Sequence, residues 1–268
     1  MWSWRKKRNG SASGSAGRES ASDLPKIVIV SDIHGNYEAL RALPEDYDEL
    51  WVLGDLVNYG PQPGEVIEFV RQKASLVVRG NHDDAVAFDR DPRCSMVFRR
   101  AAAETQKYTA SVLSAEQRNY LGELPLFLKV QRGTWTFYLC HAAPSDPLYT
   151  YCRADIGKWA KELALAGTDV LFVGHTHNQF YLRDGRRVVV NPGSLGQPKI
   201  GRSWATFAVW ERGSVVLRSY PYPVEKTVDR VRAMTVSPQV QEFLGTVLET
   251  GVVPEFNLER IHVENQGA

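Results

Sequence analysis

The sequence predicts an α/β domain, because short buried strands alternate with amphipathic helices along most of the chain. Residues 27–30, 49–53 and 76–78 are runs of mainly apolar, often β-branched residues, a pattern typical of strands buried on both faces. Segments with apolar residues at helical spacing lie between them, as in βαβ units. Hydrophobic residues make up 43% of the chain and charged residues 24%, which is the usual balance of a globular protein with a core.

The 268 residues suffice for one large domain, which we expect to span residues 25–268. Residues 1–24 differ in composition. A short basic and aromatic stretch is followed there by Ser, Gly and Ala, which is typical of a flexible tail. The region 84–122 shows no strand signal, which predicts a helical insertion that lies over the functional site. Residues 224–268 should form C-terminal helices.

Capping and stop signals indicate the helices of the N-terminal half. Asn36 can cap a first helix that Pro44 ends, and Pro63 opens a second helix. Within the predicted insertion, Ser114 and Gln117 form a capping box for a further helix.

Capping and turn residues also predict the helix and the hairpins of the C-terminal half. Asp155 can cap a helix, and Gly167 lies just beyond its end. Strand patterns flank the remaining turns, which predicts hairpins. These turns are at Gly133, at Asp184-Gly185 and at Arg212-Gly213.

Charge and cysteine content exclude several classes of function. The net charge is +1, so strong nucleic-acid binding is not expected. No apolar run approaches the ~18–20 residues that a membrane span needs. The three cysteines are too few for a disulfide framework, and a reducing cytoplasm is the expected setting. A homo-oligomer remains an option.

Polar motifs occur where the predicted strands end. Five of the six histidines belong to them, while His262 stands alone and is expected to be structural. Since ligands gather at the carboxyl ends of strands in open α/β sheets, these loops can converge. In D-I-H (32–34) and H-T-H (175–177), extended backbone would aim both polar side chains the same way. The motifs are S-D-I-H-G (31–35), G-D-L (54–56), G-N-H-D (80–83), C-H (140–141) and G-H-T-H (174–177).

These motifs supply a set of nitrogen and oxygen donors that suits two transition metals. The set has two carboxylates, four imidazoles and one amide oxygen, without a thiolate, which favours manganese, with iron, zinc, nickel or cobalt as alternatives, over calcium. Seven ligands are too many for one ion, but two ions that share a carboxylate can use them all. The predicted ligands are Asp32, His34, Asp55, Asn81, His141, His175 and His177.

The order of the motifs resembles that of the calcineurin-like metallophosphoesterases. Asp-x-His, Gly-Asp, Gly-Asn-His-Asp, a lone His and Gly-His-x-His all occur here in register between Lys26 and about Gly196. The stretches 55–63, 191–198 and 253–259 are more narrowly similar to the small prokaryotic phosphodiesterase branch, which includes some diadenosine tetraphosphate hydrolases.

The resemblance implies a fold and a mechanism. The fold would be a four-layer α/β/β/α sandwich of two mixed sheets flanked by helices. Asp55 would bridge the two metals, and a metal-bridging hydroxide would attack phosphorus. His82, which is not a ligand in this family, would hydrogen-bond the phosphate or protonate the leaving group. One metal would be held by Asp32, His34, Asp55 and His177, and the other by Asp55, Asn81, His141 and His175.

One departure from the family pattern bears on the substrate. Where the phosphoprotein-phosphatase branch has an Asp that orients the catalytic His and then a phosphate-binding Arg, this chain has Asn58 and Tyr59. The change weakens a protein-phosphatase function and removes the usual carboxylate partner of His82. Asp83 or a water could take its place.

Cationic and aromatic residues near the motifs are candidates for substrate binding. Arginine matches phosphate geometry, and arginines of the predicted insertion could overhang the site. Tyr59, Tyr149 and Tyr151 could stack on a base, or could simply pack. The candidate arginines are Arg93, Arg99, Arg100 and Arg153.

Three functions remain open at this point. The first is hydrolysis of a small phosphodiester or a nucleotide phosphoanhydride, and the second is hydrolysis of a dinucleoside polyphosphate such as diadenosine tetraphosphate. The third is a catalytically silent scaffold. Since scaffolds with this fold usually lose ligands or the acid, the complete set here favours an enzyme that acts on a small phosphoester or nucleotide.

Overall fold

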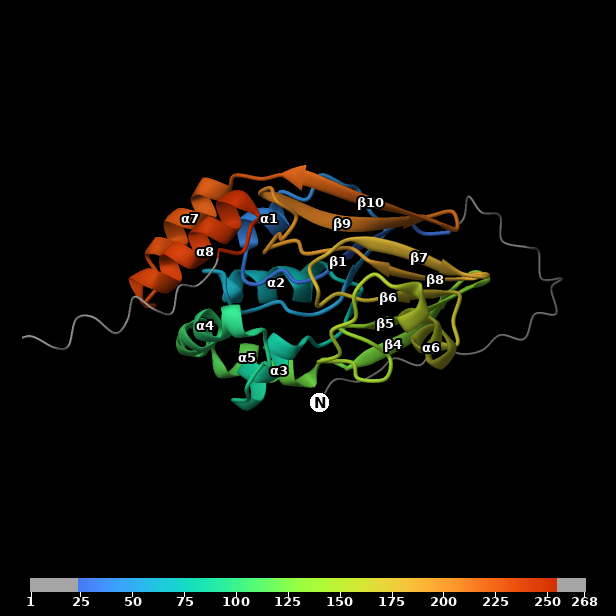
Figure 1. Cartoon of the computed structure of the whole chain (residues 1–268), viewed down its shortest axis with the longest axis horizontal. Coiled ribbons are helices and arrows are strands. Elements are labelled where there is room, and N and C mark those ends of the chain that lie inside the picture. Colours follow the sequence, from blue (N-terminus) through green and yellow to red (C-terminus); the bar gives the residue numbers. More distant parts are fainter. Residues whose placement is uncertain (1–23, 255–268) are drawn as a thin grey trace, which may run out of the picture.

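A computed structural model describes residues 24–254 as two packed β-sheets with helices around them (Figure 1). The predicted tail, apart from Leu24, and residues 255–268, which include His262, lie outside the described residues. Each sheet has five strands and mixes parallel with antiparallel pairs.

The first sheet is built around β1, which pairs with β2 in parallel and with β9 antiparallel. β2 continues in parallel to β3, and β9 forms a long hairpin with β10 around the predicted Arg212-Gly213 turn. The strand order is β10 (Ser214–Pro221), β9 (Trp204–Glu211), β1 (Ile27–Val30), β2 (Glu49–Val52) and β3 (Leu76–Val77).

The second sheet has a parallel centre with an antiparallel hairpin on each side. β5, β6 and β8 run in parallel, β4 pairs with β5, and β7 pairs with β8 around the predicted Asp184-Gly185 turn. The order is β4 (Phe127–Arg132), β5 (Trp135–Cys140), β6 (Val170–Phe172), β8 (Arg187–Asn191) and β7 (Phe180–Asp184).

Alternation along the strands divides the core into layers. On β1, Val28 and Val30 pack with α1 (Tyr37–Arg41) and α2 (Pro63–Lys73), whereas Ile27 and Ile29 face the second sheet. The outer face of the second sheet packs on α6 (Ile156–Ala166) through Trp159 and other apolar residues. The four-layer α/β/β/α architecture is therefore confirmed.

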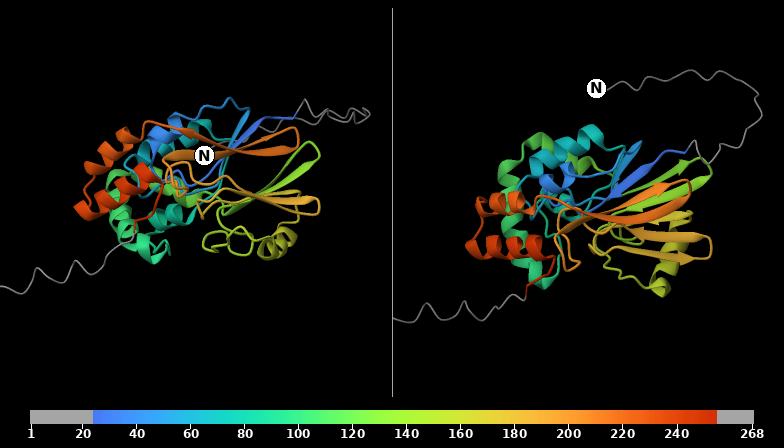
Figure 2. Two further views of the ribbon diagram at one scale, coloured as in Figure 1. Left: turned by 45° about the horizontal axis from the view of Figure 1, so that its top comes forward. Right: turned by 90° about the horizontal axis from the view of Figure 1, so that it is seen from above.

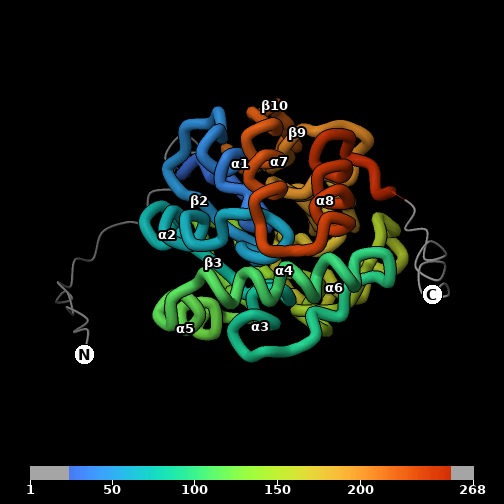
Figure 3. Tube along the Cα trace, turned by 90° about the vertical axis from the view of Figure 1, so that its left-hand side faces the viewer, coloured from blue at the N-terminus to red at the C-terminus, as the bar shows by residue number. Residues whose placement is uncertain are grey.

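The remaining helices gather at the end of the sheets where the parallel strands finish (Figures 1 and 3). The further views show the same segregation, with α6 alone on the other flank (Figure 2). These helices are α3 (Asn81–Phe88), α4 (Arg99–Val112), α5 (Ala115–Glu123), α7 (Val224–Arg232) and α8 (Pro238–Thr250), with a 3₁₀ turn at Met96–Phe98.

Most predicted boundaries agree with the structure, and two do not. Asn36, Ser114 and Asp155 cap their helices as predicted. The region 84–122 is not helical throughout, because 89–95 is irregular between α3 and the 3₁₀ turn. α3 also begins at Asn81, so the G-N-H-D motif opens a helix instead of ending a strand.

None of the helices within residues 24–254 combines the length and the apolar character that crossing a bilayer requires.

Candidate metal centre

The predicted ligands come from five separate segments that end at one edge of the two sheets. Asp32 and His34 follow β1, Asp55 follows β2, and His141 follows β5 directly. His175 and His177 lie in the loop after β6, and Asn81 is the first residue of α3. All of these side chains are buried except that of His175, which is partly exposed.

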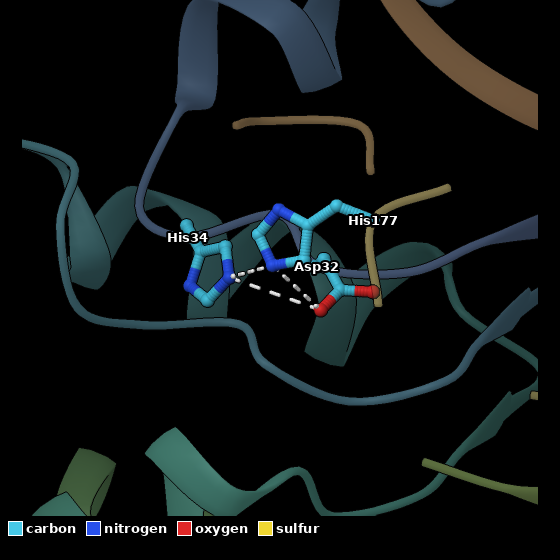
Figure 4. Close-up of side chains that lie close together, drawn as sticks. All are labelled: Asp32, His34 and His177. Atoms are coloured by element: carbon cyan, nitrogen blue, oxygen red, sulfur yellow. Dashed lines mark hydrogen bonds and ion pairs between the residues drawn. The ribbon is translucent and has the colours of Figure 1, made fainter. Parts of the chain in front are cut away.

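Asp32, His34 and His177 form the first group (Figure 4). Nε2 of His34 lies 3.2 Å from Nε2 of His177, and Nε2 of His177 lies 3.3 Å from Oδ1 of Asp32. Asp55 adjoins this group, since its Oδ2 is 3.8 Å from Nε2 of His34.

Asp55 also begins the second group. The same Oδ2 lies 3.2 Å from Nε2 of His141. Oδ1 of Asn81 lies 3.0 Å from Nε2 of His141 and 3.1 Å from Nδ1 of His175. The seven side chains therefore form one cluster in which the Asp55 carboxylate touches both groups, as sharing of this carboxylate by two ions would require.

Backbone carbonyls fix how three of the imidazoles face the cluster. Nδ1 of His34, His141 and His177 lies 3.1, 2.8 and 2.8 Å from the carbonyl oxygens of Val57, Leu53 and Gln197. A carbonyl can only accept, so each Nδ1 carries a proton, and each ring in its neutral form turns the lone pair of Nε2 inward.

The interior of the cluster has the polarity that a cation would satisfy. Two Nε2 lone pairs meet where His34 and His177 approach, and the buried Oδ1 of Asp32 has no hydrogen-bond partner among the described residues. Converging lone pairs and an unsatisfied carboxylate oxygen are unfavourable alone and suit divalent ions. The donor set therefore fits the predicted metals.

Proton affinities in the cluster follow from burial and from the two carboxylates. Burial would raise the pKa of Asp55, but the neighbouring His141 outweighs it and holds that pKa well below its usual value. Burial would lower the pKa of His141, but Asp55 outweighs it and raises that pKa to about 9. At His175 and His82 burial dominates, and it lowers the pKa of His175 to about 3 and that of His82 to about 4.

The ligand-bearing loops are strained, which corrects the expectation of extended backbone. Asp32, His34, His175 and His177 all have left-handed φ angles between 47° and 65°. Tight turns, instead of strand alternation, therefore bring each Asp-x-His or His-x-His pair together. Such conformations are unfavourable for non-glycine residues and cluster at functional sites.

Close approach of two loops requires glycine at position 80. A Cβ there would collide with Oδ1 and the backbone nitrogen of Asp55. Gly54 faces the same contact with a φ of 87°, which favours glycine as well.

His82 lies beside the cluster and has a partner that the sequence analysis did not foresee. Nδ2 of Asn58 lies 2.9 Å from Nδ1 of His82, so the residue in place of the usual Asp contacts this ring directly. The suggestion that Asp83 takes this role is wrong. Its carboxylate instead accepts the backbone N–H groups of Asp55, Leu56 and Gly80.

The N-P-G-S loop (residues 191–194) supports the backbone of the ligand loops through hydrogen bonds. Nδ2 of Asn191 donates to the carbonyl of Gly174 and to Oγ1 of Thr176 at 2.6 and 3.1 Å. Oγ of Ser194 donates to the carbonyl of Asp32 at 2.8 Å. These bonds position the backbone of the H-T-H and D-I-H motifs.

A cavity of about 260 Å³ opens over the cluster. Of the four candidate arginines only Arg93 lines it, with its guanidinium 4.4 Å from the ring centre of Tyr149. Lys199 lines it too, with its ammonium 4.4 Å from the ring centre of Phe98. Lys199 was not predicted as a site residue, although it directly follows the 191–198 stretch that carried part of the resemblance. The other lining residues are Asp55, Tyr59, Asn81, His82, Cys94, Ser95, Tyr151, His175 and His177.

The structure places the other three candidate arginines elsewhere. Arg99 lines a separate cavity between the 89–95 segment and α4. Arg100 pairs with Glu104 at 2.9 Å, and Arg153 is exposed next to α6.

Comparisons with known proteins define the class of this chain. The family model of the calcineurin-like phosphoesterase superfamily domain matches residues 26–213. The crystal structure of a metallophosphoesterase from Sphaerobacter thermophilus is 30% identical, with a TM-score of 0.69 and coverage of 84% of this chain and 99% of that chain. The chain therefore belongs to the calcineurin-like phosphoesterase superfamily, which confirms both the resemblance and the predicted class of enzyme.

Two further relatives are similar to this chain over different shares of its length. An uncharacterized protein from Methanocaldococcus jannaschii is 28% identical over 248 residues, which is 84% of this chain and 98% of that protein. A symmetrical bis(5'-nucleosyl)-tetraphosphatase from Vibrio cholerae is 33% identical over 129 residues, which is 44% of either chain. The second similarity therefore covers less than half of each protein.

Proposed function

We propose that this protein hydrolyses phosphodiester or nucleotide phosphoanhydride bonds at a centre of two divalent metals. The position of the Asp55 carboxylate carries the proposal, because one oxygen lies within 3.8 Å of imidazole nitrogens from both ligand groups. The ions would be held by the two sets of residues that the resemblance implies, with Asp55 in common.

The bound metals would supply a water of lowered pKa and positive charge to receive the phosphate. The chain itself supplies a hydrogen-bond donor next to them. With Nδ2 of Asn58 on its Nδ1, neutral His82 carries its proton on Nε2, which can be donated to a phosphate or leaving oxygen. His82 is 4% exposed and lines the cavity over the cluster.

Manganese is the metal that we propose, since the donors are imidazole, carboxylate and amide oxygen. The described cysteines Cys94, Cys140 and Cys152 are all free, which supports the proposal of a reducing cytoplasm. Cys140 packs in the core against α6 and turns away from the cluster.

A dinucleoside polyphosphate is the second candidate substrate, and the mouth of the cavity favours it. Tyr151 is 56% exposed there, and its ring lies 5.7 Å from that of His175, so it offers a surface for a base. The partial similarity to a bis(5'-nucleosyl)-tetraphosphatase supports the same substrate class.

Hydrolysis of bis(p-nitrophenyl) phosphate with added manganese tests the proposal. The protein should turn over this diester, and Asp55→Asn should lose both the activity and part of the bound metal measured by elemental analysis. Asp184→Asn, which removes an exposed carboxylate on the β7–β8 hairpin, is the matched control and should retain both. No turnover of diesters, monoesters or dinucleoside polyphosphates with manganese, nickel, cobalt, zinc or iron would refute the proposal.

A further inference from the structure

Two cations, Arg93 and Lys199, line the cavity but have no role in the reaction proposed at the metals. Among residues 24–254, the guanidinium of Arg93 and the ammonium of Lys199 form no ion pair with a carboxylate, whereas most described arginines do. Each instead lies over an aromatic ring, Arg93 over Tyr149 and Lys199 over Phe98. A cation over a ring keeps its charge and leaves its donors available.

The two cations reach the cavity from separate parts of the chain. Arg93 belongs to the irregular segment before α4 and has a left-handed φ of 54°. Lys199 belongs to the loop between β8 and β9 and is partly buried. Asp55 provides the only carboxylate among the described lining residues. The wall outside the metal cluster is therefore cationic.

We propose that Arg93 and Lys199 form a second anion subsite that selects substrates with a further phosphate group next to the scissile one. This inference rests on the proposed phosphoesterase function and narrows its substrate class. Guanidinium and ammonium groups are the usual ligands of phosphate oxygens, and here they lie in the same cavity as the metal ligands.

The size of the cavity limits what the subsite holds. A volume of about 260 Å³ is below the range of about 300–1,000 Å³ for sites that enclose whole drug-sized ligands. The cavity therefore takes the phosphates at the point of cleavage, and any nucleoside extends past exposed Tyr151. A phosphoanhydride chain satisfies both the metals and the two cations, whereas a simple diester leaves the cations unused.

The test compares two substrates in the manganese-loaded protein. Diadenosine tetraphosphate carries phosphates beyond the scissile one, and bis(p-nitrophenyl) phosphate carries none. Arg93→Gln and Lys199→Gln should each lower kcat/KM for the tetraphosphate about tenfold, mainly through KM, because each removes a charge-assisted hydrogen bond. Neither should change kcat/KM for the diester.

Matched controls remove the same charge elsewhere. Arg118→Gln and Lys107→Gln alter exposed cations of the separate cavity and should leave both substrates unaffected. Equal losses on both substrates, or no loss on either, would overturn the inference while the phosphoesterase proposal stands. A parent protein that cleaves the diester but neither cleaves nor is inhibited by the tetraphosphate would overturn it too.

A second measurement keeps the inference testable without turnover. Sodium tripolyphosphate added to the metal-free protein should raise its Tm, and the Arg93→Gln/Lys199→Gln double variant should lose most of that shift. The same shift in both proteins would overturn the inference. Absence of hydrolysis by the parent protein would refute the proposed function and, with it, the selection of substrates, whereas the Tm shift alone decides whether Arg93 and Lys199 bind an anion.

Discussion

The second sheet meets two different kinds of structure, α6 on its outer face and the ligand loops at the ends of β5 and β6. α6 has an Asp155 cap, a glycine with left-handed φ at its end and a buried stripe that includes Leu163. The loops instead place non-glycine residues in left-handed conformations and bury charged or polar groups. All non-glycine residues with left-handed φ in the described chain, except Asp89 and Arg212, lie at or beside the sheet edge that carries the predicted metal ligands.

Stability and activity therefore depend on different parts of the molecule. Residues of α6 satisfy local propensity and packing together, so substitutions there should alter the free energy of unfolding. The loops hold conformations and charges that lower stability and that the surrounding fold must maintain. Substitutions there should alter catalysis more than folding.

Removal of the His82 imidazole gives the largest expected effect on the loop side. His82→Ala should lower kcat about 10²- to 10⁴-fold, the usual contribution of a proton donor, and keep the metal content of the parent. The loss should be greater for an alkyl phosphate ester than for a p-nitrophenyl ester, whose leaving group needs little protonation. A parallel loss of metal would show instead that His82 is a ligand.

Truncation of Leu163 gives the largest effect on the α6 side. This side chain is fully buried, so Leu163→Ala should lower the free energy of unfolding by about 2–5 kcal/mol, as measured with urea. The kcat of the folded protein should not change. A fall in kcat at full folding would contradict the separation of the two regions.

Asn58 provides a smaller test of the loops. Its φ is 68°, so Asn58→Gly removes the amide without adding backbone strain. Loss of the hydrogen bond to His82 should lower kcat about tenfold, which corresponds to about 1.4 kcal/mol. Asn58→Asp retains a partner for the ring and should be more active than Asn58→Gly. A glycine variant as active as the parent would exclude a positioning role.

The cap of α6 should give the smallest effect. The Asp155 side chain accepts the N–H of Gly157 at 3.0 Å. Asp155→Ala should therefore lower the free energy of unfolding by about 1 kcal/mol and leave kcat unchanged. A thermal melt with kinetics on the same sample measures both quantities.

The fold was predictable where local signals and packing agree. Strand runs such as 27–30, caps such as Asp155 and turns such as Asp184-Gly185 lie where the sequence indicated. The start of α3 was missed because Asn81 and His82 begin a polar run of low helix propensity. Tertiary bonds from Asp83 to the Asp55 loop hold that first turn, and no periodicity reports them.

The motifs that supply the predicted metal ligands could be recognised in the sequence, but the residues that line the rest of the cavity could not. Five motifs in order identified the residues that converge, since each follows a strand or opens α3. Arg93, Lys199 and the contact of Asn58 with His82 depend on the paths of irregular loops. Such paths are set by tertiary contacts and strained φ angles, which residue types alone do not encode.

The amide of Asn81 connects the proposed metal centre with the proposed anion subsite. Its Nδ2 donates to the carbonyl of Pro92 at 2.7 Å, and this bond turns Oδ1 toward His141 and His175. Pro92 precedes Arg93, so one stretch of backbone orients a proposed metal ligand and carries a cation of the cavity wall. If both proposals hold, occupancy of the metal position and of the anion position would be thermodynamically linked. Whatever factor an anion adds to metal affinity, the metal must add to anion affinity.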